Sequence, residues 1–219
     1  MVCSDYQKYR QSYWDHFPID KPCTVPLPRY WLAKYVDRAA ILLDYGCGYG
    51  RAAPLLQAMG YDAVIGMDIA LPMLQRAHAE YPELSFVQNQ QANIPLATHA
   101  VDMIVVIAVI TYFVADHELN ALLNELQRVL KPGGKLIIGD FLLNRDARNM
   151  ARYDAVQAQM QAPYGVFRLP EGVYCRHFSE SAIQTQFSRF NTLDFTECNF
   201  TTINGNTSRG FYALLENKI

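Results

Sequence analysis

One stretch decides the fold of this chain: Ile41-Leu42-Leu43-Asp44-Tyr45-Gly46-Cys47-Gly48-Tyr49-Gly50. Three apolar residues run into an acid, and glycine then falls at every second position. This pattern predicts a short buried strand that ends in a tight loop with few Cβ atoms. Residues 51–59 then place apolar side chains on one side and end at Gly60, as a short helix does. A strand, a glycine loop and a helix in this order let a ligand approach the backbone closely, although a tight turn without a ligand is the alternative.

The composition leaves room for a hydrophobic core and carries little net charge. The 219 residues suit a single domain, 51% of them are hydrophobic, and the formal net charge of −2 argues against a general nucleic-acid surface. The five cysteines are odd in number and lack a C-x-x-C spacing, which favours neither a disulfide framework nor a zinc site and indicates a reducing, cytoplasmic setting. The five histidines are scattered without ligand spacing, so we expect no metal.

The sequence also predicts no membrane partner. No signal-peptide pattern opens the chain. The longest apolar run, Met103 to Ile110, is far shorter than the ~20 residues of a membrane helix.

Apolar runs alternate with helical patterns along residues 41–140. Strands are expected at 41–44, 63–68, 84–87, 101–107 and 135–140, with helices between them. This alternation predicts an α/β fold with a doubly wound parallel sheet, three layers deep, whose strand-end loops lie along one edge. A helix at 179–190 and two strands at about 192–201 and 208–216 follow, and Asn204-Gly205 predicts a hairpin between these strands.

An acid ends the second predicted strand. Asp68 lies 18 residues beyond Gly50, and a carboxylate at this place can accept both ribose hydroxyls of a nucleoside. Its alternative role is to cap the helix predicted at 71–80, and one residue can do both. The amide-rich loop at 88–93 follows the third strand, where its side chains can either meet a nucleobase edge or face solvent.

Two segments outside this core are rich in aromatic residues. Residues 1–40 carry tyrosines and a phenylalanine at helical spacing, followed by a proline-rich connector and a second helix at 29–38. This aromatic face is either core packing or a lid over a ligand. Between 141 and 179, Arg145, Arg148 and Arg152 fall on one helix face, which is either solvated or part of a pocket for an anionic or aromatic substrate. His177, beside Arg176, can be a base or a structural residue.

Four motifs together resemble the class I S-adenosylmethionine-dependent methyltransferases. They are Asp44-x-Gly46-x-Gly48-x-Gly50, the segment from Asp68 through Pro72-Met73-Leu74, Val101-Asp102-Met103-Ile104 with valine in place of the usual phenylalanine, and Arg128-Val129-Leu130-Lys131-Pro132-Gly133-Gly134. They occur in the family's order over residues 40–140. The resemblance implies a Rossmann-like, seven-stranded sheet that is mostly parallel with an antiparallel last strand. It also implies S-adenosyl-L-methionine as cofactor.

The resemblance assigns roles to individual residues. The loop from Gly46 to Gly50, which includes Cys47 and Gly48, would pass under the methionine part of the cofactor, and Asp44 would order this loop and approach the amino group. Asp68 would hold the ribose, with Ile69 against the adenine. Gln90 and Gln91 stand where the family often has an aspartate that contacts the adenine amino group. Ile107, through its backbone, and Ala108 would flank the methionine end.

The implied reaction is an in-line methyl transfer to a small-molecule acceptor, in which alignment matters more than acid–base chemistry. Tyr112, just after the fourth strand, is the first candidate to face the substrate, followed by His177 and Tyr13. Tyr153 and Arg176 are further candidates for binding it. The chain would be one methyltransferase domain, 1–219, with a helical lid at 1–40, a cofactor-binding core at 41–140, a substrate-side insertion at 141–179, and a terminal helix and hairpin at 180–219.

Two other functions remain open from the sequence. One is a nicotinamide-dependent oxidoreductase, which the G-x-G-x-G spacing disfavours because dinucleotide folds carry G-x-G-x-x-G. The other is a protein of the same fold that binds the cofactor for different chemistry. The oligomeric state cannot be read from the sequence.

Overall fold

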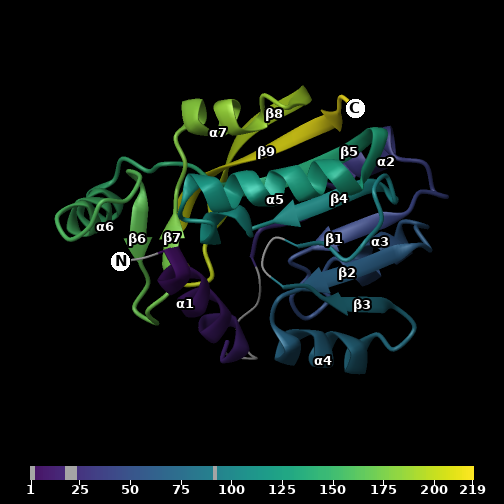
Figure 1. Cartoon of the computed structure of the whole chain (residues 1–219), viewed down its shortest axis with the longest axis horizontal. Coiled ribbons are helices and arrows are strands. Elements are labelled where there is room, and N and C mark those ends of the chain that lie inside the picture. The colour runs from purple at the N-terminus through teal and green to yellow at the C-terminus, as the bar shows by residue number, and fades with distance from the viewer. Residues whose placement is uncertain (1–2, 18–23, 91–92) are drawn as a thin grey trace.

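A computed structural model describes residues 3–17, 24–90 and 93–219. A seven-stranded sheet crosses the molecule in the order β3-β2-β1-β4-β5-β9-β8 (Figure 1). Its strands are β1 (Leu42–Tyr45), β2 (Val64–Asp68), β3 (Ser85–Gln88), β4 (Val101–Ile107), β5 (Leu130–Phe141), β8 (Phe190–Thr201) and β9 (Thr207–Asn217). Only β9 runs antiparallel to its neighbours, β5 and β8. The mostly parallel, seven-stranded fold is therefore confirmed.

Helices cover both faces of this sheet. The helices of the core are α2 (Arg29–Tyr35), α3 (Ala53–Ala58), α4 (Leu71–Glu80), α5 (Asp116–Val129) and α7 (Glu180–Phe187). Side chains alternate along β4, so that Ile104 and Val106 pack in the core under α5 and α7, whereas Met103 and Val105 pack in the core under α2 and α3. The three predicted layers follow from this alternation.

A smaller unit stands at the carboxyl edge of the sheet. It consists of α6 (Ala147–Gln157) and the antiparallel pair β6 (Val166–Arg168) and β7 (Tyr174–Arg176), close to α1 (Cys3–Asp15) and the 3-10 helix η1 (Ile110–Tyr112) (Figure 1). The sequence predicted the α6 helix but not the two strands. Each strand has only three residues, which is too short for a clear alternating pattern.

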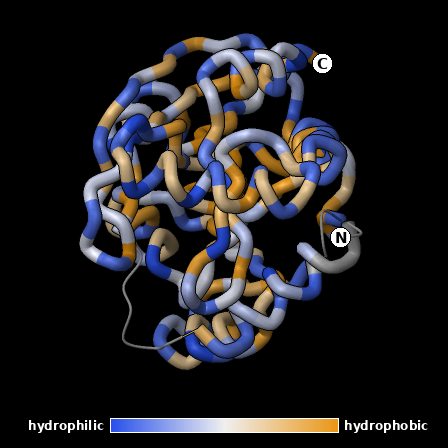
Figure 2. The backbone as a smooth tube through the Cα atoms, turned by 90° about the vertical axis from the view of Figure 1, so that its left-hand side faces the viewer, coloured by the Kyte–Doolittle hydropathy of each residue, from blue (hydrophilic) through white to orange (hydrophobic). Residues whose placement is uncertain are grey.

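The hydrophobic segments gather in the interior and the hydrophilic ones lie toward the outside (Figure 2). Across the described residues, no helix combines the length and apolar character needed to span a bilayer.

Candidate functional site

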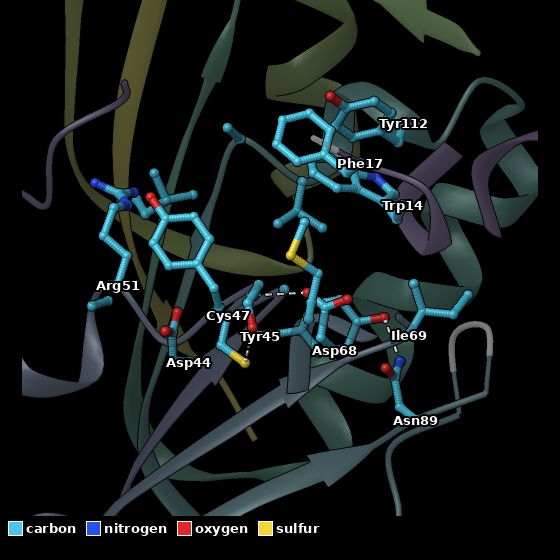
Figure 3. Close-up of a pocket in the computed structure, with 18 of the residues that line it drawn as sticks. Trp14, Phe17, Asp44, Tyr45, Cys47, Arg51, Asp68, Ile69, Asn89 and Tyr112 are labelled. Atoms are coloured by element: carbon cyan, nitrogen blue, oxygen red, sulfur yellow. Dashed lines mark hydrogen bonds between the residues drawn. The ribbon is translucent and has the colours of Figure 1, made fainter. Parts of the chain in front are cut away.

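A pocket opens at the carboxyl ends of β1, β2 and β4, which is where a doubly wound sheet places its ligands. Most residues predicted for the cofactor line it (Figure 3): Asp44, Gly46, Cys47, Gly48, Asp68, Ile69, Ile107 and Ala108. Tyr112 lines the same pocket from η1. The structure thus brings residues from three strand ends around one cavity. Gly50 stays outside the lining, because it turns the chain toward α3 with φ +85°.

The glycine loop has a backbone that only glycine accommodates at its first position. Gly46 has φ +78°, and a Cβ atom there would lie 2.3 Å from Cγ2 of Val109. The N–H groups of Gly46 and Cys47 donate to the carbonyl of Met67 at 2.7 and 2.9 Å, which ties the loop to β2. At Gly48, with φ +55°, a Cβ would meet no atom within 4 Å. Hydrogen bonds to β2 therefore hold the start of the loop, while the space next to Gly48 is open.

Asp68 connects this loop to the start of α4. One carboxylate oxygen accepts from the N–H of Gly48 at 2.8 Å, and the other accepts from the N–H of Ala70 at 2.9 Å. Burial raises the pKa of Asp68, while these N–H donors oppose that shift. The side chain lines the pocket, and each oxygen keeps a second lone pair for a ligand. Of the two roles open from the sequence, the N-cap role is wrong, because Ala70 is the N-cap residue of α4, and the ribose-binding role stays a prediction.

Asp44 is the buried acid of the pocket. Its side chain is 4% exposed, and its Oδ2 atom has no hydrogen-bond partner among the described residues. Burial raises the pKa of Asp44 to about 7, the nearby Asp68 adds to the shift, and Arg51 opposes it. A buried carboxylate without a partner is costly, and a cationic ligand group would relieve that cost.

Asn89, rather than Gln90, supplies an amide to the pocket. Asn89 is 4% exposed, lines the cavity, and donates from Nδ2 to the Tyr45 hydroxyl at 3.2 Å. Gln90 is exposed and lines no pocket, so its predicted position is corrected by one residue. The reason is that β3 ends at Gln88, so Asn89 is the first residue after the strand and lies at the carboxyl edge of the sheet, where the pocket opens. Gln91 lies outside the described residues.

Helix α1 forms a roof over the pocket. Arg10 donates to the carbonyl of Tyr112 at 3.1 Å, and Gln11 donates to the carbonyl of Ile69 at 3.2 Å, so the helix is tied to loops on both sides. Trp14 and Phe17 line the cavity beside Tyr112 (Figure 3). Arg10, which also lines the pocket, is buried over the Phe113 ring. No local pattern marks Arg10, because its partners lie about a hundred residues away.

A second pocket adjoins the first. The two cavities share a wall made by Trp14, Ala108, Tyr112 and Ile203. The second pocket continues toward α6, β7 and the β8–β9 hairpin, and His177 lines it. Ala108 holds the left-handed backbone, φ 57°, at the junction of the two. Tyr112 therefore faces both cavities.

His177 is held as a neutral hydrogen-bond donor. Its Nδ1 atom lies 2.7 Å from the Tyr153 hydroxyl and 3.3 Å from Nδ2 of Asn144. The Asn144 orientation follows from its Oδ1, which accepts from the N–H of Arg209, so both neighbours of Nδ1 are donors. Nδ1 then accepts and Nε2 carries the hydrogen. Burial, aided by Arg152, lowers the pKa of His177 to about 3, so the geometry corrects the predicted role as a base.

Three other predicted substrate residues line neither pocket. Arg176 is 5% exposed and pairs with Asp116 at 2.6 Å. Along β7, Cys175 faces the second pocket, so alternation turns Arg176 away from it. Tyr153 is fully buried with its ring against His177, and Tyr13 belongs to the same small core and stacks on Tyr112. These residues support the pocket rather than line it.

Comparison with known proteins supports the family that the motifs predict. Residues 43–138 match the family model described as a methyltransferase domain. A putative methyltransferase from Encephalitozoon cuniculi is 31% identical over 112 residues, which cover 51% of this chain and 50% of that protein. Trans-aconitate 2-methyltransferase from Azoarcus sp. is 38% identical over 105 residues, which cover 47% of this chain and 40% of that protein. The chain thus spans half or less of the length of these curated relatives.

A solved structure extends the likeness to most of the chain. A SAM-dependent methyltransferase from Methanosarcina mazei superposes with a TM-score of 0.81 at 24% identity, covering 88% of this chain and 98% of that one. Residues 43–138 therefore carry the methyltransferase-domain match, which supports the class I S-adenosylmethionine-dependent methyltransferase family that the motifs predict, and the solved structure shares its fold. The cofactor that goes with this family is S-adenosylmethionine.

The residues present fit that cofactor. The unpartnered Oδ2 atom of Asp44 is an acceptor for an ammonium group, which S-adenosylmethionine carries on its methionine part. The open side of Gly48 leaves room for close approach to the loop, and the carboxylate of Asp68 retains lone pairs for ribose hydroxyls. Asn89 and Ile69 line the same cavity and suit an adenine.

Proposed function

We propose that the protein transfers the methyl group of S-adenosylmethionine to a small-molecule acceptor bound in the second pocket. The observation that carries this proposal is the wall common to both cavities, made by Trp14, Ala108, Tyr112 and Ile203. A donor in the first pocket and an acceptor in the second would meet at this wall. In-line displacement needs that arrangement, because nucleophile, methyl carbon and sulfur must lie on one line.

The residues of the chain act mainly by positioning. The cofactor supplies an already activated methyl group when bound. Asp44, Asp68 and the glycine loop hold it, while Trp14 and Phe17 close the pocket from above and exclude water. Tyr112 offers a ring and a hydroxyl where donor and acceptor would meet. Since His177 holds a proton on Nε2 and accepts on Nδ1, the acceptor's nucleophilic atom would arrive without its proton or lose it to solvent.

The small size of the acceptor is supported by the shape of the site and by one relative. The second pocket is lined by residues of α1, α6 and the β8–β9 hairpin, so it lies between packed elements. The relative from Azoarcus sp. is named for methylating trans-aconitate, a small organic acid. We further propose a cytoplasmic location, because Cys47, Cys175 and Cys198 are free thiols.

Calorimetry separates this proposal from a nicotinamide enzyme. The protein is titrated with S-adenosylmethionine, with S-adenosylhomocysteine and with NADH under the same conditions. We expect both adenosyl ligands to bind and NADH to give no heat. Binding of NADH without the adenosyl ligands would overturn the proposal. Transfer of a labelled methyl group to a panel of small organic acids then tests for catalysis, and failure over the panel despite cofactor binding would favour other chemistry on this fold.

A further inference from the structure

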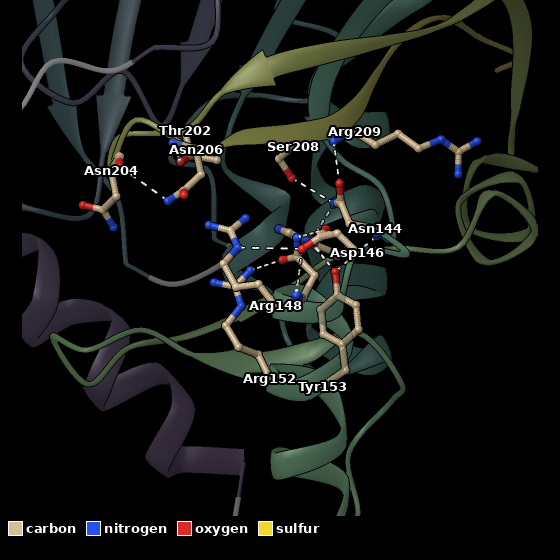
Figure 4. Close-up of polar contacts among 12 residues, drawn as sticks. Asn144, Asp146, Arg148, Arg152, Tyr153, Thr202, Asn204, Asn206, Ser208 and Arg209 are labelled. Atoms are coloured by element: carbon tan, nitrogen blue, oxygen red, sulfur yellow. Dashed lines mark hydrogen bonds and ion pairs between the residues drawn. The ribbon is translucent and has the colours of Figure 1, made fainter.

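The second pocket carries two positive charges on its lining. Arg148 and Arg152, one turn apart on α6, both line it, and the described lining residues include no Asp or Glu. The remaining polar lining consists of hydroxyl, amide and imidazole groups, such as those of Thr202, Asn206 and Ser208 on the β8–β9 hairpin. Figure 4 shows both arginine side chains in the space between α6 and this hairpin. The cavity therefore offers an anion many donors and no competing acid.

Arg152 is built into the wall. Its guanidinium lies 4.0 Å from the centre of the Phe167 ring, and one terminal nitrogen donates to Oδ1 of Asn149. Its Nε atom is buried and has no hydrogen-bond partner among the described residues. Burial lowers the pKa of Arg152, and the charge of Arg148 lowers it further. The Arg152 side chain lines the cavity, and the remaining terminal N–H groups of its fixed guanidinium suit a planar oxyanion.

Arg148 is also poorly neutralised. The nearest carboxylate, that of Asp146, lies 3.9 Å from its Nε atom. Asp146 also caps α6 by accepting from the N–H of Asn149 at 3.1 Å, so this one carboxylate is shared between the helix cap and Arg148. Two like charges at this spacing repel each other and destabilise a helix. The pair is therefore better explained by a ligand than by the stability of the helix.

Arg145 shows what a merely solvated arginine looks like here. It precedes α6, is exposed and lines neither pocket. The sequence placed Arg145, Arg148 and Arg152 on one helix face. In the structure Arg145 lines neither pocket, Arg148 is also exposed but lines the second pocket, and Arg152 is half-buried in the wall of that pocket.

We propose that the methyl acceptor carries an oxyanion, a carboxylate or a phosphate, that Arg152 and Arg148 bind together. The inference rests on the proposed function, since it names the substrate class of that site. The guanidinium of Arg152 meets the oxyanion in the plane of its fork, and Arg148 adds a second charge from the rim. His177, with its hydrogen on Nε2, provides a neutral donor in the same lining. The rest of the acceptor packs against Phe141 and Phe167 and reaches toward Tyr112.

The test uses the full chain saturated with S-adenosylhomocysteine, so that only the second pocket is open. Matched acid and neutral probes are titrated by calorimetry: benzoate against benzamide, phenylacetate against phenylacetamide, and phenyl phosphate against phenol. We expect at least one acid to bind ~10-fold more tightly than its neutral partner. Carboxylate and phosphate arms show which oxyanion the site prefers. Arg152→Gln and Arg148→Gln should each reduce this preference to about threefold or less, whereas Arg145→Gln should leave it unchanged.

The outcomes distinguish the two proposals. If S-adenosylhomocysteine fails to bind, the proposed function fails. If it binds to the wild type and to all variants but no acid is preferred over its neutral partner, the oxyanion site is refuted and the cofactor site stands. An equal loss of preference in Arg145→Gln would also refute the assignment, because it would show general surface charge. Retained S-adenosylhomocysteine affinity in the Arg152 variant shows that the protein is folded.

Discussion

Replacing Asp44 by asparagine should stabilise the unliganded protein at alkaline pH and weaken its cofactor binding. The Asp44 carboxylate is buried, its Oδ2 atom has no partner among the described residues, and its pKa is raised from 3.8 to about 7. The folded state therefore binds this proton more tightly than the unfolded state does. Stability is lost as the pH rises from about 4 to about 7. An asparagine has the same shape and carries no charge at any of these pH values.

The size of the effect follows from the two pKa values. A rise from 3.8 to about 7 corresponds to about 4 kcal/mol of lost unfolding free energy once Asp44 is fully ionised. About 2 kcal/mol of this loss falls between pH 5.5 and pH 8. The difference in unfolding free energy between the asparagine variant and the wild type should therefore rise by about 2 kcal/mol, in favour of the variant, from pH 5.5 to pH 8. Asp140, whose pKa is also raised to about 7 by burial, contributes equally to both proteins and cancels.

Cofactor binding should move in the opposite direction. Loss of a charged acceptor for the ammonium group costs about 1.5–3 kcal/mol, or roughly 10- to 150-fold in affinity. Wild-type affinity should fall below pH 7 as Asp44 takes up its proton, and the variant should lack this dependence. Urea unfolding at pH 5.5 and 8, with calorimetry of S-adenosylhomocysteine, measures both. A variant that loses stability at pH 8, or that binds as tightly as the wild type, would refute the reasoning.

Four further substitutions test the glycine loop, Asp68 and helix α1. Gly46→Ala should lower the free energy of unfolding by about 2 kcal/mol or more, because the strain of a left-handed backbone adds to the 2.3 Å contact with Val109. Gly48→Ala should lower it by only about 1 kcal/mol, because no atom lies within 4 Å of the new Cβ. Urea unfolding measures both losses, and equal losses would contradict this prediction. Asp68→Ala should cost about 1–3 kcal/mol of cofactor affinity by calorimetry, and unchanged binding would remove it from the site. Trp14→Ala should speed dissociation of S-adenosylhomocysteine in stopped-flow without unfolding the protein, whereas an unfolded variant would make the aromatic face of α1 part of the core.

Local patterns were enough to predict the sheet and its glycine loop. The strand before Gly46, the acid at Asp68 and the hairpin at Asn204-Gly205 each depend on residues adjacent in the chain, and the structure has them in the predicted places. Period-2 alternation and backbone-permissive glycines act over a few residues, so they can be read without tertiary contacts.

Side-chain direction in the irregular parts was not accessible in this way. Asn89 lines the pocket in place of the predicted Gln90, because β3 ends at Gln88. A shift of one residue changes which side chain faces the carboxyl edge of the sheet. Arg176 lies buried against Asp116 because β7 turns it away from the pocket.

The sequence by itself determined the resemblance to the methyltransferases, the doubly wound sheet and the edge of the sheet where the first pocket lies, because these follow from short-range patterns. Only the tertiary structure decided that Arg10 roofs that pocket, that His177 is a neutral donor, and that Arg148 and Arg152 share a cavity without acids. Each of these depends on contacts between segments from about 25 to about 100 residues apart. Sequence spacing does not encode such contacts, because the fold alone brings the segments together.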